Sequence, residues 1–120
     1  NTKYNNNAVF DNNVLVGMNG AFVAVQAIAA AGANPTRKGL IAAIEKKGAT
    51  FFGAGLAPLN YSATNHGGYN GYWFGTYSPT GEMKPNGGVY NVYTTDSGTG
   101  AVVKSTYTRP AMPANGLPIK

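Results

Sequence analysis

Residues 16–45 read VGMNGAFVAVQAIAAAGANPTRKGLIAAIE, and this stretch predicts two helices joined by a short turn. Its first half is rich in alanine, the best helix former, and is apolar almost all the way round. Gly32 is expected to end the first helix, because glycine adopts the left-handed conformation of a helix C-terminus at little cost. Thr36 is placed to cap the second helix with its hydroxyl, and Pro35 holds the entry rigid.

The first helix is expected over residues 13–31, and short polar side chains mark its start. Asp11, Asn12 and Asn13 can accept hydrogen bonds from the free amides of a first helical turn. Further along, a stripe of apolar side chains at helical spacing predicts the face turned toward the core. The stripe comprises Val14, Met18, Phe22, Val25 and Ala29.

The second helix is expected to end at Gly48. Leu40, Ile41 and Ile44 share one of its faces, at spacings of three and four. The lysines at 46–47 lie in its last turn, where positive charge is favourable against the negative end of the helix dipole.

The periodicity changes after the helix pair, and residues 49–109 are expected to be rich in strands and loops. A short strand could begin at Leu59 but not earlier, because Pro58 cannot donate a hydrogen bond to a central ladder. Residues 62–68, SATNHGG, are typical of a turn-rich loop. Residues 69–77, YNGYWFGTY, predict a strand rich in aromatic side chains.

The last third of the chain predicts a hairpin. Residues 78–88 hold two prolines and three glycines and are expected to form a loop or wide turn. Residues 89–93 and 101–107 follow as two strands, with the turn at residues 96–100. The tail at residues 110–120 contains three prolines and is expected to be irregular.

Composition narrows the class of protein. The chain has 120 residues, enough for one domain, and is 43% hydrophobic but only 11% charged. Its net charge is +5, but the basic residues are scattered and form no concentrated stripe, which argues against a nucleic-acid partner. The absence of cysteine excludes disulfides and thiolate zinc sites.

The apolar stretch at residues 14–33 is interrupted by glycines and by Asn19 and Gln26. A membrane span needs about 20 mostly apolar residues, so the interruptions favour a buried helix of a soluble protein. The chain opens on the polar sequence NTKYNNN, with no initiator Met and no apolar leader. This start is typical of a processed chain or a piece of a longer one.

Residues for catalysis are sparse. His66 is the single histidine, the acids are Asp11, Glu45, Glu82 and Asp96, and no metalloprotease or nucleophile-elbow motif is present. The sequence therefore predicts no catalytic residue, no metal site and no cofactor. The simplest role for His66 is to order its loop by hydrogen bonding.

Residues 11–77 carry an ordered set of motifs that resembles the periplasmic solute-binding proteins of the branched-chain amino-acid, or leucine-binding, type. The set begins in the helix pair and continues through a glycine-containing connector, a short proline-containing segment and the loop around His66, and it ends in the aromatic strand. The matching positions are Gly17, Ala31-Gly32, Asn34-Pro35-Thr36-Arg37, residues 40–45, residues 53–61, residues 62–68 and residues 69–77.

The resemblance implies an α/β fold, as a fragment of a type I periplasmic-binding-protein fold in which a helix pair precedes β-strands and loops. Residues 1–120 would form one segment of the C-terminal part: the helix pair at 13–47, a strand-rich part at 49–109 and an irregular tail at 110–120. Complete family members have two lobes that close on a ligand. Asn12 and Asn13 stand close to the position from which the family reaches the ligand, although helix capping is the simpler role for both.

The resemblance also implies function and partners. The parent protein would capture a branched-chain amino acid, or a similar small carboxylate or amide, for an ABC importer without performing chemistry. Its partners would be that ligand, the permease of the inner membrane, and the rest of the parent chain or a second copy of this segment. The location would be periplasmic or extracellular, with a lipid anchor in a Gram-positive organism.

Three alternatives remain open from the residues. The aromatic strand could serve a small secreted carbohydrate-binding or adhesion module, because sugars and bases stack on such rings. A hydrolase could assemble its groups around His66 in space, since catalytic triads are geometric. Exposed sheet edges and a very apolar helix could instead produce self-association.

Overall fold

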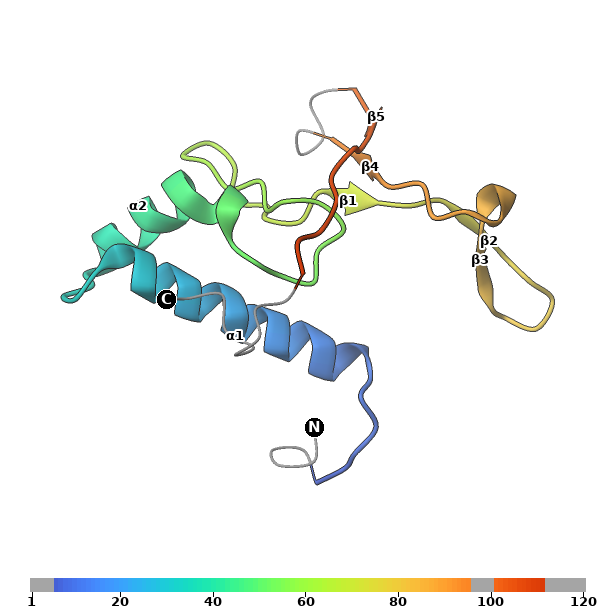
Figure 1. Ribbon diagram of the computed structural model, residues 1–120, viewed down its shortest axis with the longest axis horizontal. Coiled ribbons are helices and arrows are strands. Elements are labelled where there is room, and N and C mark those ends of the chain that lie inside the picture. Colours follow the sequence, from blue (N-terminus) through green and yellow to red (C-terminus); the bar gives the residue numbers. More distant parts are fainter. Residues whose placement is uncertain (1–5, 96–100, 112–120) are drawn as a thin grey trace.

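The computed structural model describes residues 6–95 and 101–111, and it combines a helix pair with small antiparallel sheets (Figure 1). The mixed α and β content that the sequence predicts is therefore confirmed. In chain order the elements are α1 (Asn12–Ala31), α2 (Arg37–Lys47), a 3₁₀ turn (Gly48–Thr50), β1 (Gly71–Tyr72), β2 (Gly75–Tyr77), β3 (Met83–Pro85), a second 3₁₀ turn (Asn86–Gly88), β4 (Tyr93–Thr94) and β5 (Val103–Lys104).

The helix pair forms as its end signals predict. The Asp11 carboxylate caps α1 by accepting a hydrogen bond from the Val14 amide at 2.9 Å. Gly32 ends α1 with a φ of 92°, and the Thr36 hydroxyl caps α2 by accepting from the Gly39 amide at 3.0 Å. The α-helical part of α2 ends before Gly48, as expected.

Gly48 serves a different purpose from the expected one. Its φ is −54°, so the chain continues in a right-handed 3₁₀ turn and needs no left-handed cap. Glycine fits because the Tyr61 ring lies close, with Cδ2 3.0 Å from the place a β-carbon would occupy.

The predicted core stripe of α1 is wrong in part. Val14 and Phe22 are half-buried, but Met18, Val25 and Ala29 are exposed. The buried residues of α1 are Asn19, Gln26 and Ala27. The side of α1 that carries the two carboxamides faces the connector at residues 51–57, and α1 also packs against α2. The rest of its apolar surface, including Val16 and Ile28, has no cover among the described residues.

The expectation of a buried first helix is also contradicted. By length and composition α1 could cross a membrane, since it has 20 residues and its most apolar 18-residue stretch has a mean hydropathy of 1.8. Only 17% of that stretch is buried. Core helices of soluble proteins and signal sequences pass the same test, so this property assigns no location. In α2, Leu40 and Ile44 are half-buried and Ile41 is exposed.

The strands form two small sheets. The first has the order β1-β4-β5, and all its pairs are antiparallel, with Tyr72 opposite Tyr93 and Tyr93 opposite Lys104. The pairing of β4 with β5 confirms the predicted hairpin, although residues 89–92 lie outside the strand. The predicted turn at 96–100 falls outside the described residues.

The single aromatic strand expected at residues 69–77 is wrong. It is divided into β1 and β2, which belong to different sheets, because β2 pairs with β3 within the predicted loop 78–88. The two aromatic residues between β1 and β2 pack against different rings. Trp73 packs edge-on against Tyr90 with ring centroids 4.9 Å apart, and Phe74 packs against Tyr93 at 5.4 Å.

No strand begins at Leu59, contrary to expectation. Leu59 is instead a buried residue of an irregular segment, and the next residue, Asn60, donates its amide to the Gly68 carbonyl at 2.8 Å. That bond closes the loop at residues 60–68 on itself, so the segment has no neighbouring strand to join.

The described chain is open in shape. Its buried apolar residues are Ala27, Ala57 and Leu59, and no large side chain among the described residues is fully buried. The radius of gyration is 16.6 Å, against about 13–14 Å for a compact chain of this length. Figure 1 shows the reason, since the β2–β3 hairpin projects to the side, away from α2.

Candidate functional site

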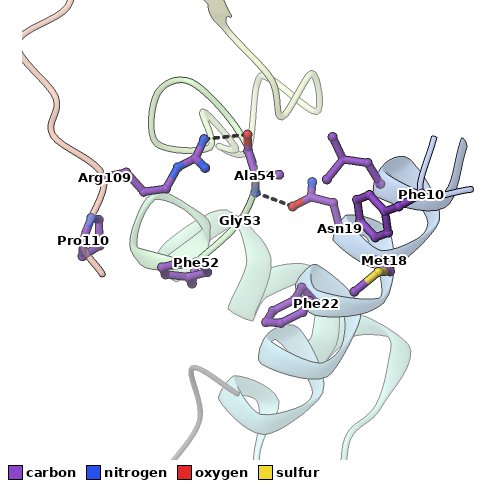
Figure 2. Close-up of a pocket in the computed structure, with 10 residues that line it drawn as sticks. Phe10, Met18, Asn19, Phe22, Phe52, Gly53, Ala54, Arg109 and Pro110 are labelled. Carbon is purple, nitrogen blue, oxygen red and sulfur yellow. Dashed lines mark hydrogen bonds between the residues drawn. The ribbon is translucent and has the colours of Figure 1, made fainter. Parts of the chain in front are cut away.

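A groove runs along the first half of α1. It consists of two adjoining cavities of about 340 and 300 Å³ that share Leu15, Asn19 and Ala54. The first is lined by residues that precede or belong to α1, by the connector and by the returning chain near residue 110: Phe10, Leu15, Met18, Asn19, Phe22, Phe52, Gly53, Ala54, Arg109 and Pro110 (Figure 2). Most of this wall is apolar.

Two carboxamides of α1 hold the connector in place. The Gln26 side chain accepts from the Phe52 amide at 2.6 Å and donates to the Phe52 carbonyl at 2.7 Å. Two turns earlier on the same face, Asn19 Oδ1 accepts from the Ala54 amide at 2.6 Å, and Asn19 Nδ2 donates to the Tyr69 hydroxyl. Gly53 is needed at this approach, because a β-carbon there would lie 2.9 Å from Asn19 Oδ1.

Arg109 supplies the cationic edge of the groove. Its Nη2 donates to the carbonyl oxygens of Ala54 and Gly55, both at 2.8 Å. Figure 2 shows this side chain reaching from the returning chain to the connector, opposite Met18 and Phe22 of α1. The two bonds fix one end of the guanidinium and leave its Nη1 and Nε groups without a hydrogen-bond partner among the described residues.

Tyr69 and Asn70 lie on the wall of the second cavity. Partial burial, and to a lesser degree the neighbouring Tyr61, raise the pKa of the Tyr69 phenol above its usual value of 10.0, so the group stays neutral. Because the Tyr69 oxygen accepts from Asn19, its own proton remains available to donate. Asn70 Oδ1 is buried without a hydrogen-bond partner in the described chain.

The structure places Asn12 and Asn13 at the start of α1, where both are exposed. The cap is made by Asp11, so neither asparagine is the N-cap. Neither lines the groove, although Phe10 and Leu15 on either side of them do. Their role in ligand binding stays a prediction.

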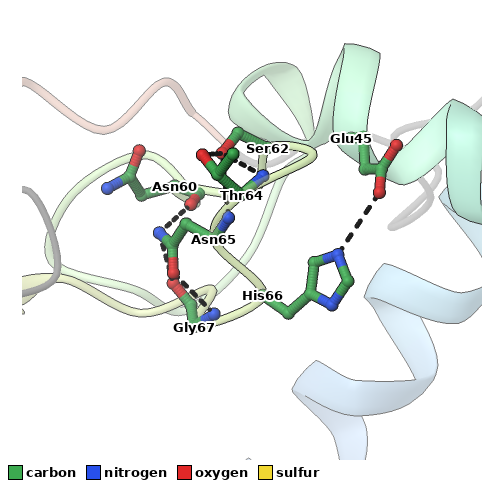
Figure 3. Close-up of polar contacts among 7 residues, drawn as sticks. All are labelled: Glu45, Asn60, Ser62, Thr64, Asn65, His66 and Gly67. Carbon is green, nitrogen blue, oxygen red and sulfur yellow. Dashed lines mark hydrogen bonds and ion pairs between the residues drawn. The ribbon is translucent and has the colours of Figure 1, made fainter.

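The loop around His66 is ordered mainly by its neighbour, Asn65. The Asn65 carboxamide donates to the Asn60 carbonyl at 2.5 Å and accepts from the Gly67 amide at 2.9 Å (Figure 3). His66 Nε2 lies 3.3 Å from Glu45 Oε1 of α2, so it ties the loop to the helix pair. In the described ranges no three acids, histidines or cysteines gather as a metal site.

The aromatic residues of the second half do not form one platform. Trp73 is half-buried against Tyr90, while Phe74 and Tyr77 are exposed, Tyr77 at 72%. Some of these rings therefore pack against other rings, and others are exposed to solvent.

Sequence reasoning missed the residues that build the groove. It treated Asn19 and Gln26 as interruptions of an apolar run, although a spacing of seven residues places both carboxamides on one face of a helix. That spacing is a signal for a polar contact along the helix. Arg109 gave no such signal, because its partners are 54 and 55 residues away in the chain.

A comparison of the chain with protein families, with curated proteins and with solved structures found no match.

Proposed function

We propose that this chain is part of an extracytoplasmic solute-binding protein of an ABC importer, of the leucine-binding type. The observation that carries the proposal is the uncovered apolar side of α1. A helix that is hydrophobic nearly all round is normally enclosed by other elements. Here Val16 is 71% exposed and Ile28 50% exposed, and the helix contains no charged residue.

The ordered motifs of residues 11–77 support this choice over other large proteins. They span both helices and their caps, the connector, the loop at 62–68 and the aromatic segment. In the family these belong to the C-terminal part of a type I periplasmic-binding-protein fold, where other elements of the lobe would cover α1.

The proposed activity is capture without chemistry. A branched-chain amino acid, or a similar small carboxylate or amide, binds between two lobes and holds them closed. The ligand shifts the population toward the closed form only to the extent that it binds the closed form more tightly than the open form. The closed protein then delivers its ligand to the membrane permease, with Asn12 and Asn13 near the ligand side of this segment.

The test uses the protein expressed from the complete reading frame that encodes this chain. Isothermal titration calorimetry with leucine, isoleucine, valine and their amides is expected to show saturable binding at one site per chain. Small-angle X-ray scattering is expected to show a smaller radius of gyration on ligand addition, as lobe closure requires. Absence of binding to all these compounds contradicts the proposal.

A carbohydrate-binding or adhesion module is the second candidate, because Tyr77 is an exposed aromatic ring on the projecting β2–β3 hairpin, in the aromatic segment at residues 69–77. Saccharide binding that is lost in both Trp73→Ala and Tyr77→Ala favours this candidate. Loss in Trp73→Ala alone points to a damaged hairpin, since Trp73 packs against Tyr90.

A further inference from the structure

We propose that Arg109 selects a carboxylate over a neutral amide in a ligand whose apolar part lies in the groove beside α1. The inference rests on the proposed function and deepens it, because that function leaves carboxylates and amides equally acceptable. It assigns the discrimination to one side chain in the first cavity, which is lined by Phe22, Phe52 and Met18.

The guanidinium is already oriented. Its Nη2 is held at 2.8 Å from the carbonyl oxygens of both Ala54 and Gly55, so little conformational freedom remains to be lost when a ligand binds. Each pair of parallel N–H groups on a guanidinium includes Nη2, which is engaged here, so the free donors on Nη1 and Nε can each make one charge-assisted hydrogen bond to a carboxylate oxygen. An amide offers a single oxygen and no charge.

The charge of Arg109 is uncompensated in the part of the chain that the structure describes. Ion pairs there join His66 to Glu45 and Lys84 to Glu82, and Arg109 belongs to neither. The two carbonyl groups offer dipoles but no negative charge. A carboxylate arriving at this edge would supply the missing charge, and the apolar wall strengthens the attraction by lowering the local dielectric constant.

The other polar side chain of the first cavity, Asn19, carries no charge and so cannot favour a carboxylate as a guanidinium does. Both ends of the Asn19 carboxamide are engaged, with the Ala54 amide and with the Tyr69 hydroxyl. Asn19 therefore shapes the wall and does not compete with Arg109 for the ligand. The cavity of about 340 Å³ is within the range of about 300–1,000 Å³ typical of small-molecule sites.

The class of ligand follows from the Arg109 guanidinium and from the apolar wall of the first cavity. It is a small monocarboxylate with an aliphatic or aromatic body, placed with its carboxylate on Arg109 and its body against the apolar wall to which Phe22 and Phe52 belong, two rings that pack on each other with centroids 6.4 Å apart. Dicarboxylates and strongly polar bodies are excluded by the apolar wall, because burying an unpaired polar group costs free energy.

The experiment compares two compounds with the same carbon skeleton, 4-methylpentanoate and 4-methylpentanamide. Their dissociation constants are measured by calorimetry on the protein expressed from the complete reading frame. The wild type is expected to prefer the carboxylate by about 10- to 100-fold, the factor typical of one charge-assisted hydrogen bond. Arg109→Gln is expected to abolish this preference, so that both compounds bind about equally, and Arg109→Lys, which keeps the charge without the fixed orientation of the guanidinium, is expected to give an intermediate value.

Arg37→Gln is the matched control, since it removes the same charge from the exposed start of α2. It is expected to leave the preference unchanged. Because Arg109→Gln also loses two carbonyl contacts and can lower the folded fraction, the readout is the ratio of the two dissociation constants, which a lower folded fraction does not alter. A preserved ratio in Arg109→Gln, or equal binding of both compounds by the wild type, overturns the inference while the proposed function stands. Failure to bind either compound overturns the inference, and failure to bind the leucine panel as well overturns both.

Discussion

Gln26 is the residue that joins α1 most firmly to the connector. Its side chain makes two hydrogen bonds with the backbone of Phe52, at 2.6 and 2.7 Å, as a neighbouring strand would. Gln26→Ala leaves a half-buried amide and carbonyl without partners, so we expect the free energy of unfolding to fall by about 1–3 kcal/mol. Urea denaturation followed by far-UV circular dichroism measures the change.

The control for Gln26→Ala is Asn13→Ala, which removes an exposed carboxamide from the same helix. We expect this variant to stay within about 0.5 kcal/mol of the wild type. Equal losses in the two variants would contradict the role assigned to Gln26.

Tyr69 is expected to make the stability of the folded protein depend on pH in the alkaline range. Its folded pKa is raised by partial burial and by Tyr61, so the folded chain holds the phenol proton more tightly than the unfolded chain. The resulting stability is fully present below the unfolded pKa and is lost as the pH rises through the folded pKa. We expect Tyr69→Phe to reduce the slope of unfolding free energy against pH above about pH 10.

Tyr77→Phe is the matched control for this slope, because it removes the same hydroxyl from an exposed ring on β2 that does not line the groove. Unfolding is measured from about pH 8 to 11.5 in both variants. A slope that changes equally in both would show that Tyr69 is not the titrating group.

At the scale of elements, Gly75 decides whether β2 and β3 can pair. A β-carbon at Gly75 would lie 2.5 Å from the Lys84 carbonyl oxygen and 2.5 Å from a ring carbon of Trp73. Since neither the strand backbone nor the packed ring can move freely, we expect Gly75→Ala to open this hairpin. Trp73 is the only tryptophan, so its fluorescence is expected to shift to the red as the indole meets water.

Gly20→Ala provides the contrasting control. Gly20 lies within α1 and has no atom within 4 Å of its β-carbon position, so we expect a gain of about 0.5–1 kcal/mol from better helix propensity. The Trp73 fluorescence is expected to stay unchanged. A red shift in Gly20→Ala as well would mean that the fluorescence reports global unfolding and not the hairpin.

The helices and the β4–β5 hairpin could be predicted from sequence, but the pairings of β1 and β2 could not, for a physical reason. Helix ends depend on local signals, and Asp11, Gly32 and Thr36 each satisfy a backbone group within a few residues. Strand pairing depends on distant partners, so nothing within residues 69–77 indicated that β1 would join β4 while β2 joined β3. The groove was missed for the same reason, because Arg109 reaches its wall from a distant part of the chain.

At the scale of the whole molecule, the described chain leaves too much apolar surface in water to be expected to stay monomeric alone. Contiguous exposed apolar patches usually mark contact surfaces. We therefore expect the isolated 120-residue chain to self-associate with rising concentration in size-exclusion chromatography with light scattering. The protein from the complete reading frame is expected to stay monomeric, because the proposed lobe encloses α1.

Ile28→Glu tests which surface drives this association. Ile28 is 50% exposed on the side of α1 opposite Gln26 and Asn19, and a carboxylate there would have to be desolvated in any contact between copies. We expect the association constant of the isolated chain to fall by about 10-fold or more. Val89→Glu, at a residue 62% exposed and outside the helix pair, should leave it unchanged. If Val89→Glu weakens association and Ile28→Glu does not, the contact surface lies on the strand-rich half, and the uncovered side of α1 no longer supports an enclosing lobe.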